Sequence, residues 1–124
     1  MKELTTADAP DSIGPYSQGI ISGDKLYVSG QGPVDPETGK VVDGTPAEQT
    51  RRTLENVEAI LEAGGSSLAD VVKATVFLKD MRYYDEVNEV YGEYMSAPYP
   101  ARSAVEVVKL PVDIDVEIEV VAER

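Results

Sequence analysis

The order of apolar and polar residues in the first quarter of the chain predicts a β-hairpin. Two β-rich runs within residues 17–30 (SQGIISGDKLYVSG) flank the dipeptide Gly23-Asp24, which suits a tight turn with positive φ. Residues 31–44 are dense in Gly, Pro and Asp, and they predict a long loop with room for a short strand at Lys40–Val42. The chain therefore begins with two paired strands and a loop.

A helical period follows this loop. Thr45 can cap the helix, Pro46 fits its first position, and Glu48 completes a capping box. Apolar residues then recur at helical spacing, at Leu54, Val57, Ile60 and Leu61. The glycines of Gly64-Gly65 predict the end of the helix. We interpret the apolar stripe as core and not as part of a cofactor site.

The second half of the chain predicts a strand, a second helix and two more strands. Residues 70–80 (DVVKATVFLKD) are apolar enough for a central strand that is covered on both faces. Asp80 can cap the second helix, which Pro98 and Pro100 end. The buried stripe of this helix comprises Val87, Val90, Tyr91 and Tyr94. Residues 101–108 (ARSAVEVV) and 115–123 (DVEIEVVAE), joined by KLPVDI, are interpreted as a closing hairpin.

This order of elements predicts a single α+β domain over residues 1–124, because no linker, repeat or low-complexity tract divides the chain. Both helices are expected on one face of a mixed sheet. The chain has no further helix for the other face, so we expect an oligomer that packs sheet against sheet.

The charge of the chain limits its partners. Eleven basic and 23 acidic residues give a net charge of −12, which repels nucleic acids and anionic membranes. No apolar run approaches the roughly 20 residues of a membrane-spanning helix. The start MKELTTADAP lacks the features of a signal peptide, and there is no Cys, so we expect a cytoplasmic protein without disulfides.

The absence of both His and Cys limits the chemistry further. Serine-histidine triads, cysteine nucleophiles, histidine bases and the usual zinc sites are excluded, so catalysis has to use carboxylates, Lys, Arg, Tyr, Ser, backbone groups or water. The G-x-G of SGQGPVD has Asp35 where a dinucleotide fingerprint has Gly, and the acidic pair at Asp113 and Asp115 suits a solvated turn better than a magnesium site.

Arg102 is the residue that most needs an explanation. In the predicted closing hairpin it shares a strand face with Ala104 and Glu106, and the facing strand presents Glu117 and Glu119. One interpretation is a structural Arg–Glu pair across the strands. The other is that the planar guanidinium binds a substrate carboxylate while a nearby Glu holds or deprotonates a water.

Several segments, in order along nearly the whole chain, resemble the reactive intermediate deaminase family, RidA/YjgF. They are IGPYSQG, LYVSGQGPVDPETG, TRRTLENVEAILEAGGSSLADVVKATVFLKDM, VNEVYGEYM, PARSAVEV and LPVDIDVEIEVVA. The PARS and VEIE motifs are the most specific of them.

The resemblance implies a chorismate-mutase-like α+β fold whose sheets form the barrel of a homotrimer, with active sites between subunits. It implies a 2-iminobutanoate/2-iminopropanoate deaminase, which hydrolyses 2-imino and 2-enamine acids such as 2-aminoacrylate to 2-oxo acids and ammonia. Pyridoxal-phosphate enzymes that dehydrate serine and threonine release these compounds. No cofactor or metal is implied.

Carried over by position, the resemblance assigns the substrate carboxylate to Arg102 and the catalytic water to Glu117. It places Tyr16, Ser29, Gly30, Asn88 and Ala104 around the substrate. Two positions depart from the family: Ala104 stands where many members have Cys, and Gly32 where many have Ile. The second departure bears on pocket shape and substrate size.

Two other functions remain as alternatives. The first is a non-catalytic trimer that binds 2-oxo acids through Arg102 and regulates a partner. The second is a ribonuclease or translation inhibitor, a label attached to some members of the family. The negative charge and the absence of His disfavour the second.

Overall fold

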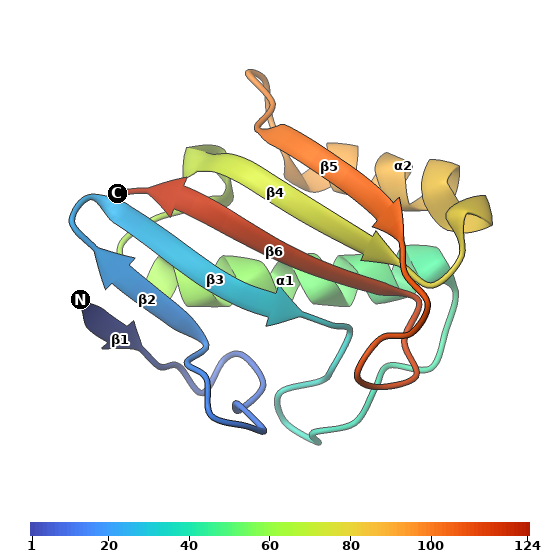
Figure 1. Ribbon diagram of the computed structural model, residues 1–124, viewed down its shortest axis with the longest axis horizontal. Helices are drawn as coiled ribbons and strands as arrows, with labels where there is room; N and C mark the ends of the chain where they lie inside the picture. The colour runs from blue at the N-terminus through green and yellow to red at the C-terminus, as the bar shows by residue number, and fades with distance from the viewer.

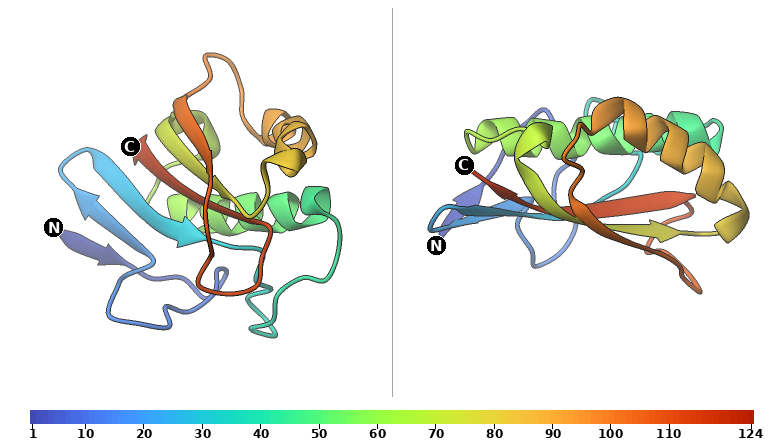
Figure 2. Two further views of the ribbon diagram at one scale, coloured as in Figure 1. Left: turned by 45° about the vertical axis from the view of Figure 1, so that its right-hand side comes forward. Right: turned by 90° about the horizontal axis from the view of Figure 1, so that it is seen from above.

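The computed structural model describes residues 1–124 as two layers, a six-stranded mixed sheet with two α-helices on one of its faces (Figures 1 and 2). The strands are β1 (Lys2–Leu4), β2 (Gly19–Ser22), β3 (Lys25–Gln31), β4 (Val71–Leu78), β5 (Ala101–Glu106) and β6 (Val116–Glu123). The helices are α1 (Pro46–Ala63) and α2 (Tyr84–Tyr94), and two 3₁₀ turns, η1 (Leu68–Asp70) and η2 (Met81–Tyr83), precede β4 and α2. The predicted α+β class is confirmed, and none of the helices has the length and apolarity to cross a membrane.

The first hairpin forms where the sequence predicts it. Strands β2 and β3 pair antiparallel, and the turn closes between Ser22 and Lys25. Gly23 adopts a φ of 63°, a left-handed conformation that a residue without Cβ takes without strain. In the loop that follows, the predicted short strand is reduced to a single bridge between Val34 and Val41.

Helix α1 begins and ends as predicted. The Thr45 hydroxyl accepts from the Glu48 N–H at 3.2 Å, and the capping box is complete. Gly64 closes the last turn, followed by Gly65 with a φ of 77°. The apolar stripe has no exposed surface and packs on the sheet; it comprises Leu54, Val57, Ile60 and Leu61.

The second helix starts later than the sequence predicts. The Asp80 carboxylate caps the 3₁₀ turn η2, accepting from the Arg82 N–H at 2.9 Å, and α2 begins only after this turn. Val87, Val90 and Tyr91 are buried as expected, whereas Tyr94 is half-buried at the margin of the core.

The predicted closing hairpin is wrong. The sheet order is β1-β2-β3-β6-β4-β5, so β4 lies between β5 and β6. Strand β5 pairs parallel with β4, and β6 pairs antiparallel with the other edge of β4 (Figure 1). The reason is the crossover through α2, which returns the chain to its starting side and makes β5 parallel to β4. The place predicted for β4 between other strands is confirmed, whereas the predicted cover on its second face is not present in the single chain, where Val72 is 40% exposed.

The helices leave one face of the sheet uncovered, as the right-hand view of Figure 2 shows. Register places Tyr27 opposite Val121 and Phe77 between Glu117 and Val105 on this open face. Tyr27 and Val105 are 48% and 42% exposed in the single chain. An apolar band of this kind is what an oligomer contact would cover, but the single chain leaves the expected oligomer a prediction.

Candidate functional site

Arg102 lies on the edge strand β5, with its guanidinium against α2. It pairs in register with Ala74, which is fully buried beneath the helices, so its side chain lies on the helix side of the sheet. The guanidinium carbon is 4.7 Å from the centre of the Tyr91 ring and 5.7 Å from that of Tyr84. One Nη atom donates to the Tyr84 hydroxyl at 3.2 Å.

No carboxylate of the chain pairs with Arg102, although six other ion pairs form. Aromatic faces hold the guanidinium instead, and they leave most of its donors free. A cation held in this way can bind an anion from outside the chain.

Asn88 belongs to the same group of residues. Tyr84, Asn88 and Tyr91 are four and three residues apart on α2 and therefore share one face of the helix. The Asn88 Oδ1 and Tyr91 Oη atoms are buried without a hydrogen-bond partner. Ala104, two residues after Arg102 on β5, packs against the core. We call these residues the arginine half-site: Tyr84, Asn88, Tyr91, Arg102 and Ala104.

Glu117 lies on the opposite face of the sheet. Its neighbours Val116 and Ile118 are fully buried under the helices, so the Glu117 side chain points to the open face. It is half-buried, and its carboxylate accepts no hydrogen bond. Burial raises the pKa of the Glu117 carboxyl above its ordinary value, and the Glu119 carboxylate adds to the rise. A carboxylate with a raised pKa and no donor is suited to accept a proton from water.

The Glu117 carboxylate lies directly over Gly30 of β3. A Cβ at position 30 would overlap a Glu117 carboxyl oxygen and stand 2.8 Å from the carboxyl carbon. The register between β3 and β6 is irregular here, between Val28 and Gln31. The absence of a side chain at Gly30 therefore lets this carboxylate approach β3 closely.

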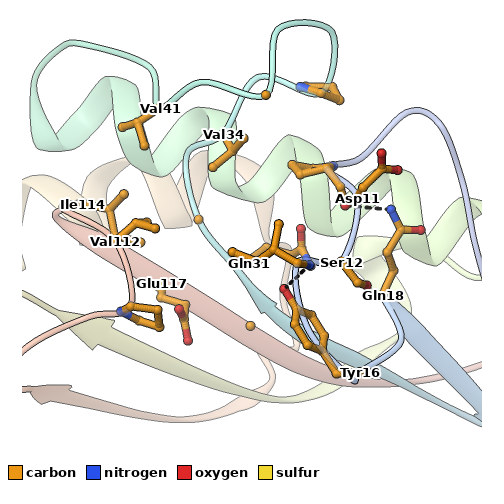
Figure 3. Close-up of a pocket in the computed structure, with 17 residues that line it drawn as sticks. Asp11, Ser12, Tyr16, Gln18, Gln31, Val34, Val41, Val112, Ile114 and Glu117 are labelled. Atoms are coloured by element: carbon orange, nitrogen blue, oxygen red, sulfur yellow. Dashed lines mark hydrogen bonds between the residues drawn. The ribbon is translucent and has the colours of Figure 1, made fainter.

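Tyr16, Gly30 and Glu117 border a cavity of about 430 Å³ (Figure 3). Its walls come from residues 10–18, 30–41 and 111–117. We call it the Glu117 cavity. Tyr16 is 48% exposed at this cavity, and its hydroxyl accepts weakly from the Ile13 N–H at 3.4 Å.

Ser29 does not line the cavity but fixes the segment that carries Tyr16. Its hydroxyl donates to the Ser17 carbonyl at 2.6 Å, and its N–H donates to the Gln18 carbonyl at 3.0 Å. The Gln18 side chain in turn donates to the carbonyls of Thr6, Ala9 and Pro10 and accepts from the Thr6 N–H. Ser29 therefore contacts the backbone of the segment that carries Tyr16 and not the cavity itself.

Two buried amides of α1 hold the loops around the cavity, and sequence reasoning missed them. Asn56 donates to the carbonyls of Gly32 and Val34, at 3.1 and 2.8 Å. Gln49 donates to the Val42 carbonyl at 3.3 Å and accepts from the Asp115 N–H at 2.8 Å. The sequence offers one signal for them: both amides lie on the buried side of α1, two turns apart, and a buried amide needs hydrogen-bond partners outside the helix.

The structure divides the predicted site residues into two groups. Tyr16, Gly30 and Glu117 meet at the Glu117 cavity. Arg102 lies in the arginine half-site on the other side of the sheet. The cross-strand Arg–Glu pair is therefore wrong, since β4 separates the strands and the two side chains face opposite ways. His, Cys, Asp and Glu side chains nowhere form a group of three or more that could hold a metal ion.

Gly30→Ala tests the fit between β3 and Glu117. The new methyl group displaces the carboxylate, which is the end of a flexible side chain, so we expect a folded protein. Displacing a reacting group by about 1 Å costs roughly a hundredfold in rate, and we expect a loss of this size in the imine hydrolysis that the sequence resemblance implies.

Gly92→Ala is the matched control, because a Cβ at Gly92 on α2 meets nothing within 4 Å. It should keep wild-type activity and stabilise the helix by about 1 kcal/mol. Equal activities of the two variants would show that the position of the Glu117 carboxylate does not matter.

Comparisons with known proteins agree on one family. The model of a family described as endoribonuclease L-PSP matches residues 6–124. A RutC family protein of Pyrococcus horikoshii is 54% identical over 98% of both chains. A Salmonella typhimurium protein named 2-iminobutanoate/2-iminopropanoate deaminase is 48% identical, over 99% of this chain and 98% of its own. The crystal structure of E. coli TdcF with bound serine matches with a TM-score of 0.94 and 42% identity, over 100% of this chain and 99% of that chain.

The match extends over the arginine half-site, the Glu117 cavity and nearly the whole chain, and the deaminase name occurs among these relatives. The resemblance found in the sequence motifs is thereby confirmed. This chain belongs to the endoribonuclease L-PSP family, the family of the RidA/YjgF proteins.

Proposed function

We propose that this protein hydrolyses 2-imino acids, and the 2-enamine acids in equilibrium with them, to 2-oxo acids and ammonia. The observation that carries the proposal is the half-buried Glu117 carboxylate, which has a raised pKa, accepts no hydrogen bond and borders a cavity. Relatives support the reaction class: one is named as a deaminase of these compounds, and another was crystallised with bound serine, an amino acid of similar size.

We place each active site between two subunits of a homotrimer. Arg102 and Glu117 lie on opposite faces of the sheet, so one chain cannot bring both to a single small substrate. The exposed apolar band on the open face supports packing between copies of the chain. In this arrangement, the arginine half-site of one subunit covers the Glu117 cavity of its neighbour.

The reaction then needs a clamp for the carboxylate and one positioned water. Arg102 binds the substrate carboxylate with its planar fork, and its charge offers a local positive site on a protein of net charge −12. The substrate reacts as the protonated imine: Glu117 takes a proton from the water as the water oxygen bonds to C2, and the C=N π electrons move to nitrogen to give a neutral carbinolamine. Glu117 returns this proton to the nitrogen. The C–N bond then breaks as the hydroxyl proton passes to Glu117 and the C=O bond forms, and the 2-oxo acid and ammonia leave, with ammonia taking up the remaining proton.

The test of this function is the release of 2-oxobutanoate from 2-iminobutanoate, which a threonine dehydratase generates in the same solution. We expect the protein to accelerate release above the spontaneous rate. No acceleration by an intact oligomer would contradict the proposal. Saturable binding of 2-oxobutanoate by that inactive oligomer would favour the alternative, a regulatory module that binds 2-oxo acids.

The raised pKa of Glu117 predicts the pH dependence of turnover. A protonated carboxyl cannot accept a proton from water, so kcat should fall on acidification, with a midpoint above the ordinary Glu value of about 4.3. Glu119→Gln removes a neighbouring negative charge and should move the midpoint to lower pH. If Glu117→Gln removes the acidic fall in kcat, the titrating group is Glu117. If Glu119→Gln leaves the midpoint of that fall unchanged, Glu119 does not influence the pKa of Glu117.

A further inference from the structure

The Glu117 cavity has two chemically different ends. Figure 3 shows Asp11, Ser12 and Gln18 at one end and aliphatic side chains at the other. We call the second the aliphatic end, and it is formed by Val34, Val41, Val112 and Ile114. Figure 3 also places the Glu117 carboxylate beside the aliphatic end, beneath Val112 and Ile114.

The position of Glu117 determines what the aliphatic end would contact. The proposed reaction places C2 of the substrate next to the water held by Glu117. The substrate carboxylate points out of this cavity, because in the proposed trimer it binds Arg102 of the neighbouring subunit, which covers the cavity from outside. The side chain on C2 then has the aliphatic end beside it.

Gly32 keeps the aliphatic end open. A Cβ at position 32 would stand 2.8 Å from the Ile114 Cδ1 atom, so any side chain there would push into the space between them. Both residues line the cavity. The size of the aliphatic end therefore depends on residue 32.

The walls of the aliphatic end are held in place before any ligand binds. Asn56, which has no exposed surface, fixes the carbonyls of Gly32 and Val34. Gln49 joins Val42, which follows Val41, to Asp115, which follows Ile114. A preformed apolar space loses little on binding, since its walls need no reordering.

We infer that the aliphatic end is the subsite for the substrate side chain, and that this protein favours 2-imino acids with longer or branched aliphatic side chains over 2-iminobutanoate and 2-iminopropanoate. The inference rests on the proposed hydrolysis. Each methylene that the subsite buries should raise kcat/KM about fourfold. The imine of leucine carries two carbons more than 2-iminobutanoate, which gives an expected preference of about fifteenfold.

The experiment compares imines that an L-amino-acid oxidase forms from 2-aminobutyrate, norvaline and leucine. Semicarbazide traps the free imine, so hydrolysis by this protein appears as a lower yield of the trapped product. We expect kcat/KM to rise in the order given for the wild-type protein. If kcat/KM for the leucine-derived imine is no higher than kcat/KM for the 2-aminobutyrate-derived imine, the subsite assignment is wrong.

Gly32→Val narrows the aliphatic end from inside, and Val41→Phe fills it from the exposed rim, so a folding defect in the first leaves the second as a test. Each should lower the ratio of kcat/KM for the leucine-derived imine to kcat/KM for the 2-aminobutyrate-derived imine to about one or less, because the added carbons are no longer buried. Ala69→Val adds carbon to an exposed residue of η1 and should keep the wild-type ratio. A wild-type ratio in both cavity variants would overturn the assignment.

A binding measurement separates the subsite from the proposed reaction. Titration calorimetry compares the product analogues 2-oxobutanoate and 4-methyl-2-oxopentanoate on the same oligomer. If no imine is hydrolysed but the longer acid binds more tightly, and Gly32→Val removes the difference, then the hydrolysis is wrong and the subsite stands. Equal affinities in the wild-type protein would overturn the subsite whatever the activity.

Discussion

Replacing Arg102 with alanine is expected to lower kcat/KM for 2-iminobutanoate by about a thousandfold, because it removes the only fixed positive charge proposed to bind the substrate carboxylate. The rest of the arginine half-site should persist. Arg102 lies on an edge strand and has no ion pair in the chain, so its loss leaves no carboxylate unpaired. The measurement is 2-oxobutanoate release with the mass of the oligomer determined in parallel.

Two further variants separate charge from geometry. Arg102→Lys keeps the charge but loses the planar fork and its stacking on Tyr91, so it should recover only a small part of the rate. Arg82→Ala is the control for loss of an exposed arginine. The Arg82 guanidinium binds Asp80, the residue that caps η2, and wild-type activity is expected. Wild-type turnover by an intact Arg102→Ala oligomer would end the carboxylate-clamp model.

The sequence was most informative where structure depends on neighbouring residues. The capping box at Thr45, the turn at Gly23 and the end of α1 at Gly64 all follow from chemistry within a few residues, and all three are confirmed. Pairing between distant strands is different. The alternation in residues 101–108 and 115–123 suits a hairpin and a β5-β4-β6 arrangement equally well, because alternation defines faces and not neighbours.

The same limit explains the candidate site. Residue types alone single out Arg102 and a nearby glutamate, and the family resemblance selects Glu117, but the wrong hairpin places the two side chains on one surface as a pair. The helical spacing assigns Tyr91 to the core and gives Tyr84 no role, so it does not predict the partners that α2 provides for Arg102. Their spacing around Asn88 on α2 was a usable signal, whereas their contact with β5 depends on the crossover and is a tertiary property.

Mixing two inactive variants is expected to restore activity. In the proposed trimer, each site takes Arg102 from one subunit and Glu117 from the next, so Arg102→Ala and Glu117→Gln impair different halves of a site. Random co-assembly of equal amounts gives an intact arginine in half of the sites and an intact glutamate in half. About a quarter of the sites are then complete, and about a quarter of wild-type activity should appear.

The control is co-assembly of wild-type chains with chains that carry both substitutions. Sites built across subunits predict about a quarter of wild-type activity in this mixture as well, whereas sites contained in one chain predict about a half here and none in the mixture of single variants. The two chains are co-expressed in equal amounts and measured without separating mixed from uniform oligomers, and native mass spectrometry confirms that they assemble at random. Arg102 and Glu117 face opposite sides of one sheet, so we expect about a quarter of wild-type activity in both mixtures. An activity of about a half in the control and none in the mixture of single variants would contradict the two-subunit site.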